Sequence, residues 1–219
     1  MTAARRSPIR RLRRTIAAHP IASFVSIAFG ASWAFTGLLS VSVLFGLVAL
    51  FGPTVAAMTV GWADGSIVEL RHRLTDWRSA PHFAMVAVGV PFAVTAAAAA
   101  MWSLGTHAAP GLGTISAIEL VIFVLVVGEE IGWRGFLLPR LRGRLSLPAA
   151  GVVTGIVWSL WHLPIYLQPG QGIAAFAVFT WWVIPFAVVM AFVVERARFG
   201  IVVATLMPGS RATPAPSRS

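Results

Sequence analysis

Residues 15–62 have the sequence TIAAHPIASFVSIAFGASWAFTGLLSVSVLFGLVALFGPTVAAMTVGW, a stretch without aspartate, glutamate, lysine or arginine. A helix needs roughly 20 apolar residues to cross a bilayer, so this stretch is long enough for two spans. The whole chain has the same character, because 58% of its residues are hydrophobic and only 11% are charged. This composition lies outside the range of soluble domains and is typical of integral membrane proteins.

The distribution of apolar residues predicts an all-α, polytopic membrane bundle over residues 15–208. A final apolar piece, Phe199–Met207, is about half the length of a span, so a seventh helix would be short or truncated. Outside the bundle we expect a basic cytoplasmic tail at residues 1–14 and a disordered tail at residues 209–219. The six predicted transmembrane helices lie near Ala17–Leu39, Ser42–Trp62, Phe83–Leu104, Ile115–Ile131, Pro148–Leu167 and Ile173–Val194.

The formal net charge of +10 comes from arginine, since the chain contains no lysine. Arginines occur in every second connection, namely the N-terminus and residues 64–78, 140–144 and 195–198. This alternation follows the positive-inside rule and places the N-terminus in the cytoplasm of a protein of the cell membrane. The partner of this basic charge is therefore the lipid bilayer, and no nucleic acid is expected. With no cysteine, disulfides and thiol chemistry are excluded.

Two adjacent acids, Glu129 and Glu130, lie at the end of the fourth predicted span. An ionised carboxylate in hydrocarbon costs about 2.5–3.5 kcal/mol, so two adjacent carboxylates here are expected to have a specific role. Arg134 follows Glu130 by one helical turn and is placed to pair with it. Glu129, about 100° away around the helix, is then free to face a cavity and act as a general base toward water. The alternative is that both acids flank the span at the cytoplasmic interface.

His162 lies in Trp158-Ser-Leu-Trp-His-Leu-Pro164, inside the fifth predicted span and on the same face as Trp158. A neutral imidazole can bind a metal, relay a proton or hydrogen-bond to water. A lone histidine in a helical bundle is more often a satisfied polar residue, but a carboxylate on a neighbouring helix favours a functional role. Glu119 shares roughly one face with Glu129, and it either deepens a polar cavity or lies near the outer interface.

These segments resemble motifs of the CPBP family, the CAAX-protease and bacteriocin-processing membrane proteins that are also called Abi proteins. The family's first motif, Glu-Glu-x-x-x-Arg, matches Glu129, Glu130 and Arg134. Its second motif, an aromatic residue one turn before a histidine, matches Trp158 and His162, with tryptophan where phenylalanine is more usual. Family members are intramembrane proteases, so the resemblance implies that Glu129, Glu130, Arg134 and His162 are the catalytic residues.

The family's third motif, His-x-x-x-Asn, is not matched, because Pro208 and Ala212 stand at its two positions. In the family these groups could hold a metal or stabilise an oxyanion, and loss of one oxyanion donor costs on the order of 100–1000-fold in rate. Phe51-Gly-Pro53 is a weaker match to an earlier family feature.

The resemblance implies an intramembrane endopeptidase in which Glu129 activates water to attack a peptide bond near the membrane surface. The substrate would be a peptide or protein, prenylated or bacteriocin-like. The family naming implies a divalent metal, but one carboxylate and one histidine are too few ligands for a closed zinc site. The sequence therefore does not decide whether a metal is bound. Because the third motif is missing, a second hypothesis is a catalytically inactive membrane binding or bacteriocin-immunity protein. A proton-coupled carrier ranks lower, since the sequence shows no inverted halves.

Overall fold

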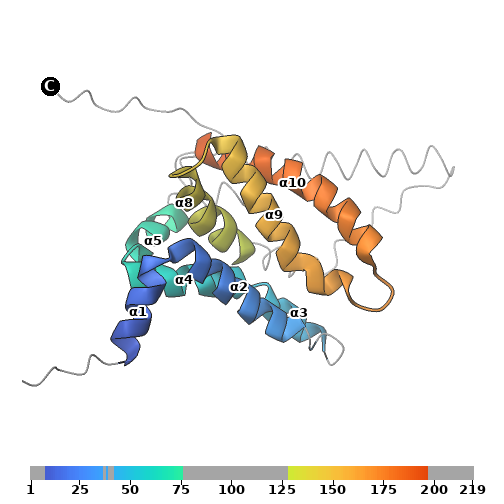
Figure 1. The fold of residues 1–219 in the computed structure, drawn as a ribbon, viewed down its shortest axis with the longest axis horizontal. Helices are drawn as coiled ribbons and strands as arrows, with labels where there is room; N and C mark the ends of the chain where they lie inside the picture. The colour runs from blue at the N-terminus through green and yellow to red at the C-terminus, as the bar shows by residue number, and fades with distance from the viewer. Residues whose placement is uncertain (1–7, 37, 39–41, 76–127, 197–219) are drawn as a thin grey trace, which may run out of the picture.

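The computed structural model describes residues 8–36, 38, 42–75 and 128–196, and every element in these ranges is helical (Figure 1). The all-α prediction is therefore confirmed for the described residues. The first part contains α1 (Pro8–Ala18), α2 (Pro20–Thr36), α3 (Val43–Ala49), α4 (Gly52–Asp64) and α5 (Ile67–Thr75). The second part begins with a helical turn at residues 128–132, followed by the π-helical η1 (Trp133–Leu137), α8 (Leu138–Arg142), α9 (Leu147–Tyr166) and α10 (Ile173–Arg196).

The described helices include two, α9 and α10, that are each long and apolar enough to cross a membrane. The bent pair of α1 and α2 provides a third candidate if the two helices together form one span. The chain is an integral membrane protein. Helices α9 and α10 correspond to the fifth and sixth predicted spans. The third predicted span, most of the fourth and the piece Phe199–Met207 lie outside the described residues, so the count of six stays a prediction.

The second predicted span is not one continuous helix. Helix α3 ends at Ala49, and α4 begins at Gly52 with Pro53 in its first turn. Proline is favoured there, because the first backbone N–H groups of a helix have no intrahelical partner. A Cβ atom on Gly52 would lie 2.8 Å from the carbonyl oxygen of Ala28, so glycine lets α4 approach the backbone of α2 closely. The break thus brings the start of α4 into the centre of the bundle.

Helices α9 and α10 pack against each other through small residues. Cβ atoms on Gly151 and Gly155 would lie 2.8 Å and 2.9 Å from the Cα atoms of Val188 and Ile184. Glycines four residues apart allow two membrane helices to approach closely, because both lie on the same helical face. One turn further along α9, the hydroxyl of Ser159 lies 2.5 Å from that of Thr180 on α10, which adds an interhelical hydrogen bond.

The arginine-bearing connections in the described residues meet at one end of the bundle. Arg13 of α1 donates a 3.2 Å hydrogen bond to the backbone at the end of α4. Arg140 of α8 forms a 2.8 Å ion pair with Asp64 at the same end of α4. Arg142 forms a 2.8 Å ion pair with Glu195 at the end of α10. The connections that the positive-inside rule assigns to one side of the membrane are thus joined to one another.

Candidate active site

The two adjacent glutamates lie inside the bundle, on the helical turn at residues 128–132. Glu129 is 4% exposed and Glu130 is 5% exposed. This turn packs closely on the start of α4, since a Cβ atom on Gly132 would lie 2.7 Å from the backbone carbon and oxygen of Pro53. The hydroxyl of Thr54 also donates to the carbonyl of Gly128. The start of α4 therefore packs against the helical turn that carries the two glutamates.

Glu130 forms the predicted ion pair with Arg134. The Nη1 atom of Arg134 donates to Oε1 of Glu130 at 2.7 Å, and the side chains are only 1% and 7% exposed. The other atoms of the pair, Oε2 of Glu130 and Nη2 of Arg134, are buried without a hydrogen-bond partner among the described residues. Burial this deep supports an internal ion pair rather than two charges flanking the span at the membrane surface.

Glu129 points to a different helix, as its position around the helical turn requires. Its Oε2 atom accepts a 3.0 Å hydrogen bond from the indole Nε1 of Trp158 on α9. The guanidinium carbon of Arg134 lies 4.3 Å from the centre of the same indole ring, a cation–π arrangement. Trp158 therefore contacts Glu129 through its edge and Arg134 through its face, and it joins the two parts of the first motif.

His162 is tied to the same tryptophan through the backbone. Its Nδ1 atom lies 2.9 Å from the carbonyl oxygen of Trp158. A carbonyl only accepts hydrogen bonds, so Nδ1 carries the hydrogen, and in neutral histidine Nε2 keeps its lone pair. The ring packs against Trp161 and Phe179, at centroid distances of 4.7 Å and 4.8 Å. The imidazole is thus held in one orientation, with Nε2 able to bind water.

The helix changes its geometry directly after the glutamates. Residues Trp133–Leu137 form a π-helical turn, in which the N–H of Leu138 bonds to the carbonyl of Trp133. All five residues of η1 are buried, and Arg134 is one of them. Single π-helical turns inside α-helices are rare and occur frequently at functional sites. The sequence did not reveal this turn.

Two further tryptophans place polar atoms in the buried region. The indole N–H groups of Trp133 and Trp161 are buried and have no hydrogen-bond partner among the described residues. The two rings pack edge to face with centroids 5.7 Å apart.

A metal centre does not assemble from the described residues. Within residues 8–36, 38, 42–75 and 128–196, no three histidine, cysteine, aspartate or glutamate side chains come together. Glu129 and His162 offer two donors, fewer than the three protein ligands of a catalytic zinc site. Glu119, Pro208 and Ala212 lie outside the described residues.

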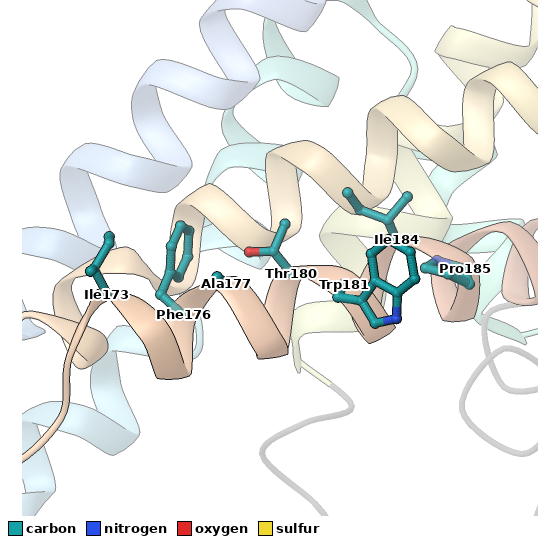
Figure 2. A pocket seen from close by; sticks show the side chains of 7 residues that line it. All are labelled: Ile173, Phe176, Ala177, Thr180, Trp181, Ile184 and Pro185. Carbon is teal, nitrogen blue, oxygen red and sulfur yellow. The ribbon is translucent and has the colours of Figure 1, made fainter.

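The described residues also form an apolar groove along one face of α10, with a volume of about 510 Å³ (Figure 2). Neither glutamate nor His162 lines it, so the groove is separate from the buried polar site. Its described lining residues are Ile173, Phe176, Ala177, Thr180, Trp181, Ile184 and Pro185.

Comparison with known proteins identifies the segment that carries these residues. The family described as type II CAAX prenyl endopeptidase Rce1-like matches residues 111–207, which include both motifs. Residues 111–207 belong to the CPBP family. The chain is similar to CAAX prenyl protease 2 of Methanococcus maripaludis, with 30% identity over 97 residues that cover 39% of this chain and 36% of the relative. The chain therefore spans little more than a third of the length of this curated relative.

Proposed function

We propose that this chain is an intramembrane endopeptidase of the CPBP type, in which Glu129 activates a water molecule to attack a peptide bond at the membrane. The observation that supports this best is the buried hydrogen bond from Trp158 to Glu129, in a site that also fixes His162. A carboxylate held in this way is oriented toward its substrate before the reaction begins, which is how a positioned general base accelerates proton transfer.

In the proposed mechanism, the oxygen of Glu129 that does not accept the Trp158 bond takes a proton from the attacking water. The hydroxide formed bonds to the carbonyl carbon of the peptide. The same proton then passes to the amide nitrogen as the C–N bond breaks, which restores the carboxylate. His162 orients the water through the lone pair on Nε2.

Glu130 and Arg134 support the site in this proposal. Their ion pair places the guanidinium against the face of Trp158, in the interior of the protein. The indole edge of Trp158 then holds Glu129. Trp158 is therefore a positioning residue, and tryptophan adds a donor that phenylalanine, more usual in the family motif, lacks.

The proposed substrate is a peptide or protein that reaches the site from the membrane. The name of the Methanococcus maripaludis relative refers to a prenyl protease of CAAX proteins, which makes a prenylated CAAX peptide the first substrate to test. A bacteriocin-like peptide is the second. We further propose a six-span bundle in the cell membrane with a cytoplasmic N-terminus, supported by the ion pairs that join the arginine-bearing connections at one end.

A second candidate function is an inactive family member that binds peptides or confers immunity to bacteriocins. It is favoured by Pro208 and Ala212, which replace the histidine and asparagine of the third motif.

The test is cleavage of a prenylated CAAX peptide and of a bacteriocin-type peptide by the chain in membranes. We expect cleavage by the wild type and none by Glu129→Ala, with Glu195→Ala as a matched acid that lies at the charged end and should stay active. Cleavage that survives Glu129→Ala would overturn the proposed mechanism. Cleavage that appears only after Pro208→His and Ala212→Asn are introduced together would establish the inactive alternative.

A further inference from the structure

Helix α1 is a separate basic helix rather than an extension of α2. Its axis is turned by 108° from that of α2, and its N-terminal end points away from the other described helices (Figure 1). The helix covers residues 8–14, which the sequence assigns to a cytoplasmic tail, and continues to Ala18. Since α2 belongs to the first predicted span, α1 lies close to the plane of the membrane surface.

The two faces of α1 differ in chemistry. At about 100° per residue, Ile9, Leu12 and Ile16 share one face, and the arginines of the helix occupy the remaining surface. Ile16 packs against the core of the bundle. Ile9 and Leu12 on the same stripe are 70% and 62% exposed. The apolar stripe of α1 therefore begins on the protein core and continues beyond it, without a described protein partner.

A contact between α1 and α4 sets the depth of the helix. The guanidinium of Arg13 lies 5.0 Å from the centre of the Trp62 ring, and its Nε donates to the carbonyl of Ala63 at 3.2 Å. Trp62 is 54% exposed, at the end of the second predicted span. Tryptophan and arginine at the end of a membrane helix are typical of the headgroup level. The contact thus holds α1 at the height where α4 leaves the membrane.

We propose that α1 is an interfacial helix that binds anionic phospholipids. Ile9 and Leu12 enter the boundary between headgroups and acyl chains, and Arg10, Arg11 and Arg14 contact the lipid phosphates. Basic amphipathic helices bind membrane surfaces through these two terms together, burial of the apolar stripe and attraction to anionic lipid. This role is independent of the proposed peptidase activity, since it uses none of the residues of the buried site.

The absence of cysteine from the chain makes the test direct, because a single introduced cysteine carries the only spin label. Leu12→Cys and Arg11→Cys are labelled with a nitroxide in the full chain. Each protein is placed in phosphatidylcholine vesicles with or without phosphatidylglycerol. Collision with oxygen, which concentrates in the bilayer, is compared with collision with a water-soluble nickel chelate. We expect the label at position 12 to favour oxygen, the label at position 11 to favour nickel, and phosphatidylglycerol to shift position 12 further toward oxygen.

Charge removal provides the control. In the Leu12→Cys protein, Arg10→Gln with Arg14→Gln should abolish the shift caused by phosphatidylglycerol. Arg144→Gln with Arg196→Gln removes the same charge from exposed arginines elsewhere at this end of the bundle and should preserve the shift. Equal nickel access at positions 11 and 12 in both vesicles would overturn the proposal and would leave α1 as a surface for a soluble protein. A shift that survives loss of Arg10 and Arg14 would overturn the role of the arginines.

Discussion

Replacing Arg134 by methionine removes the positive charge from the buried ion pair and keeps a side chain of similar length. Glu130 would then be a buried carboxylate with no opposite charge in contact among the described residues, since Arg134 is the cation that the structure places against it. Removal of one partner from a buried ion pair typically lowers the free energy of unfolding by about 3–5 kcal/mol. We expect a loss of this size for Arg134→Met.

Removing both charges tests the cause of that loss. In the double variant Glu130→Gln with Arg134→Met, neither position of the former ion pair carries a charge. Residues in direct contact usually show coupling free energies of about 0.5–3 kcal/mol, so the double variant should be more stable than the sum of the two single losses predicts. Additive losses would mean that the charges do not stabilise each other.

The assay is unfolding in mixed micelles with a rising fraction of sodium dodecyl sulfate, followed by the fluorescence of the chain's nine tryptophans. Arg142→Met is the matched control, because its ion pair with Glu195 is partly exposed, with side chains 40% and 32% accessible. It should unfold at nearly the wild-type detergent fraction. If the free energy of unfolding of Arg134→Met also stays within about 1 kcal/mol of the wild-type value, the pair behaves like a surface ion pair. That result would refute the reasoning from burial.

Trp158→Phe removes a hydrogen bond to a carboxylate worth about 1.5–3 kcal/mol and keeps an aromatic ring, so kcat should fall about 10–100-fold with KM unchanged in the peptide assay; an unchanged kcat would show that the bond does not position the base. Gly132→Ala forces a methyl group against the backbone of Pro53 and should cost about 1–3 kcal/mol in the micelle assay. Gly30→Ala, which meets nothing within 4 Å, should instead stabilise by about 0.5–1 kcal/mol; the reverse order would contradict the packing described. Partial burial alone raises the pKa of Asp64, but hydrogen bonds from the neighbouring serine and the arginine of α8 outweigh it and hold the pKa below its usual value. Its stabilising effect should therefore be full above a pH of about 4 and be lost as the pH falls through the lowered pKa, and Asp64→Asn should remove this part of the pH dependence of unfolding.

The parts of the site that the sequence predicted are local. Glu130 with Arg134, and Trp158 with His162, are each four residues apart, so helical geometry alone places them on one face. Helix α10 was also predicted closely. Its first residue, Ile173, follows the glycine-rich turn at residues 168–172, and its last turn coincides with the first charges after the apolar run.

The parts that the sequence did not predict depend on contacts between distant residues or on changes in helical geometry. The bond from Trp158 to Glu129 joins positions that lie 29 residues apart, and no spacing rule connects them. The break between α3 and α4 interrupts the second predicted span, although the apolar run continues through it. Gly151 and Gly155, in contrast, have the spacing that is typical of a close contact between membrane helices, so the sequence could have predicted the packing of α9 on α10.

The π-helical turn fixes an angular relation between the glutamates and the charged end of the bundle. The ion pair of Arg140 with Asp64 holds α8 in place. A π-helical turn holds one more residue than an α-helical turn, so rewinding η1 as a regular α-helix with no residue deleted would rotate the preceding turn by about 100° relative to α8. Glu129 would then point away from Trp158, although every side chain of the site would still be present. The π-helical winding of Trp133–Leu137 is therefore a determinant of the site, as much as the identities of its residues.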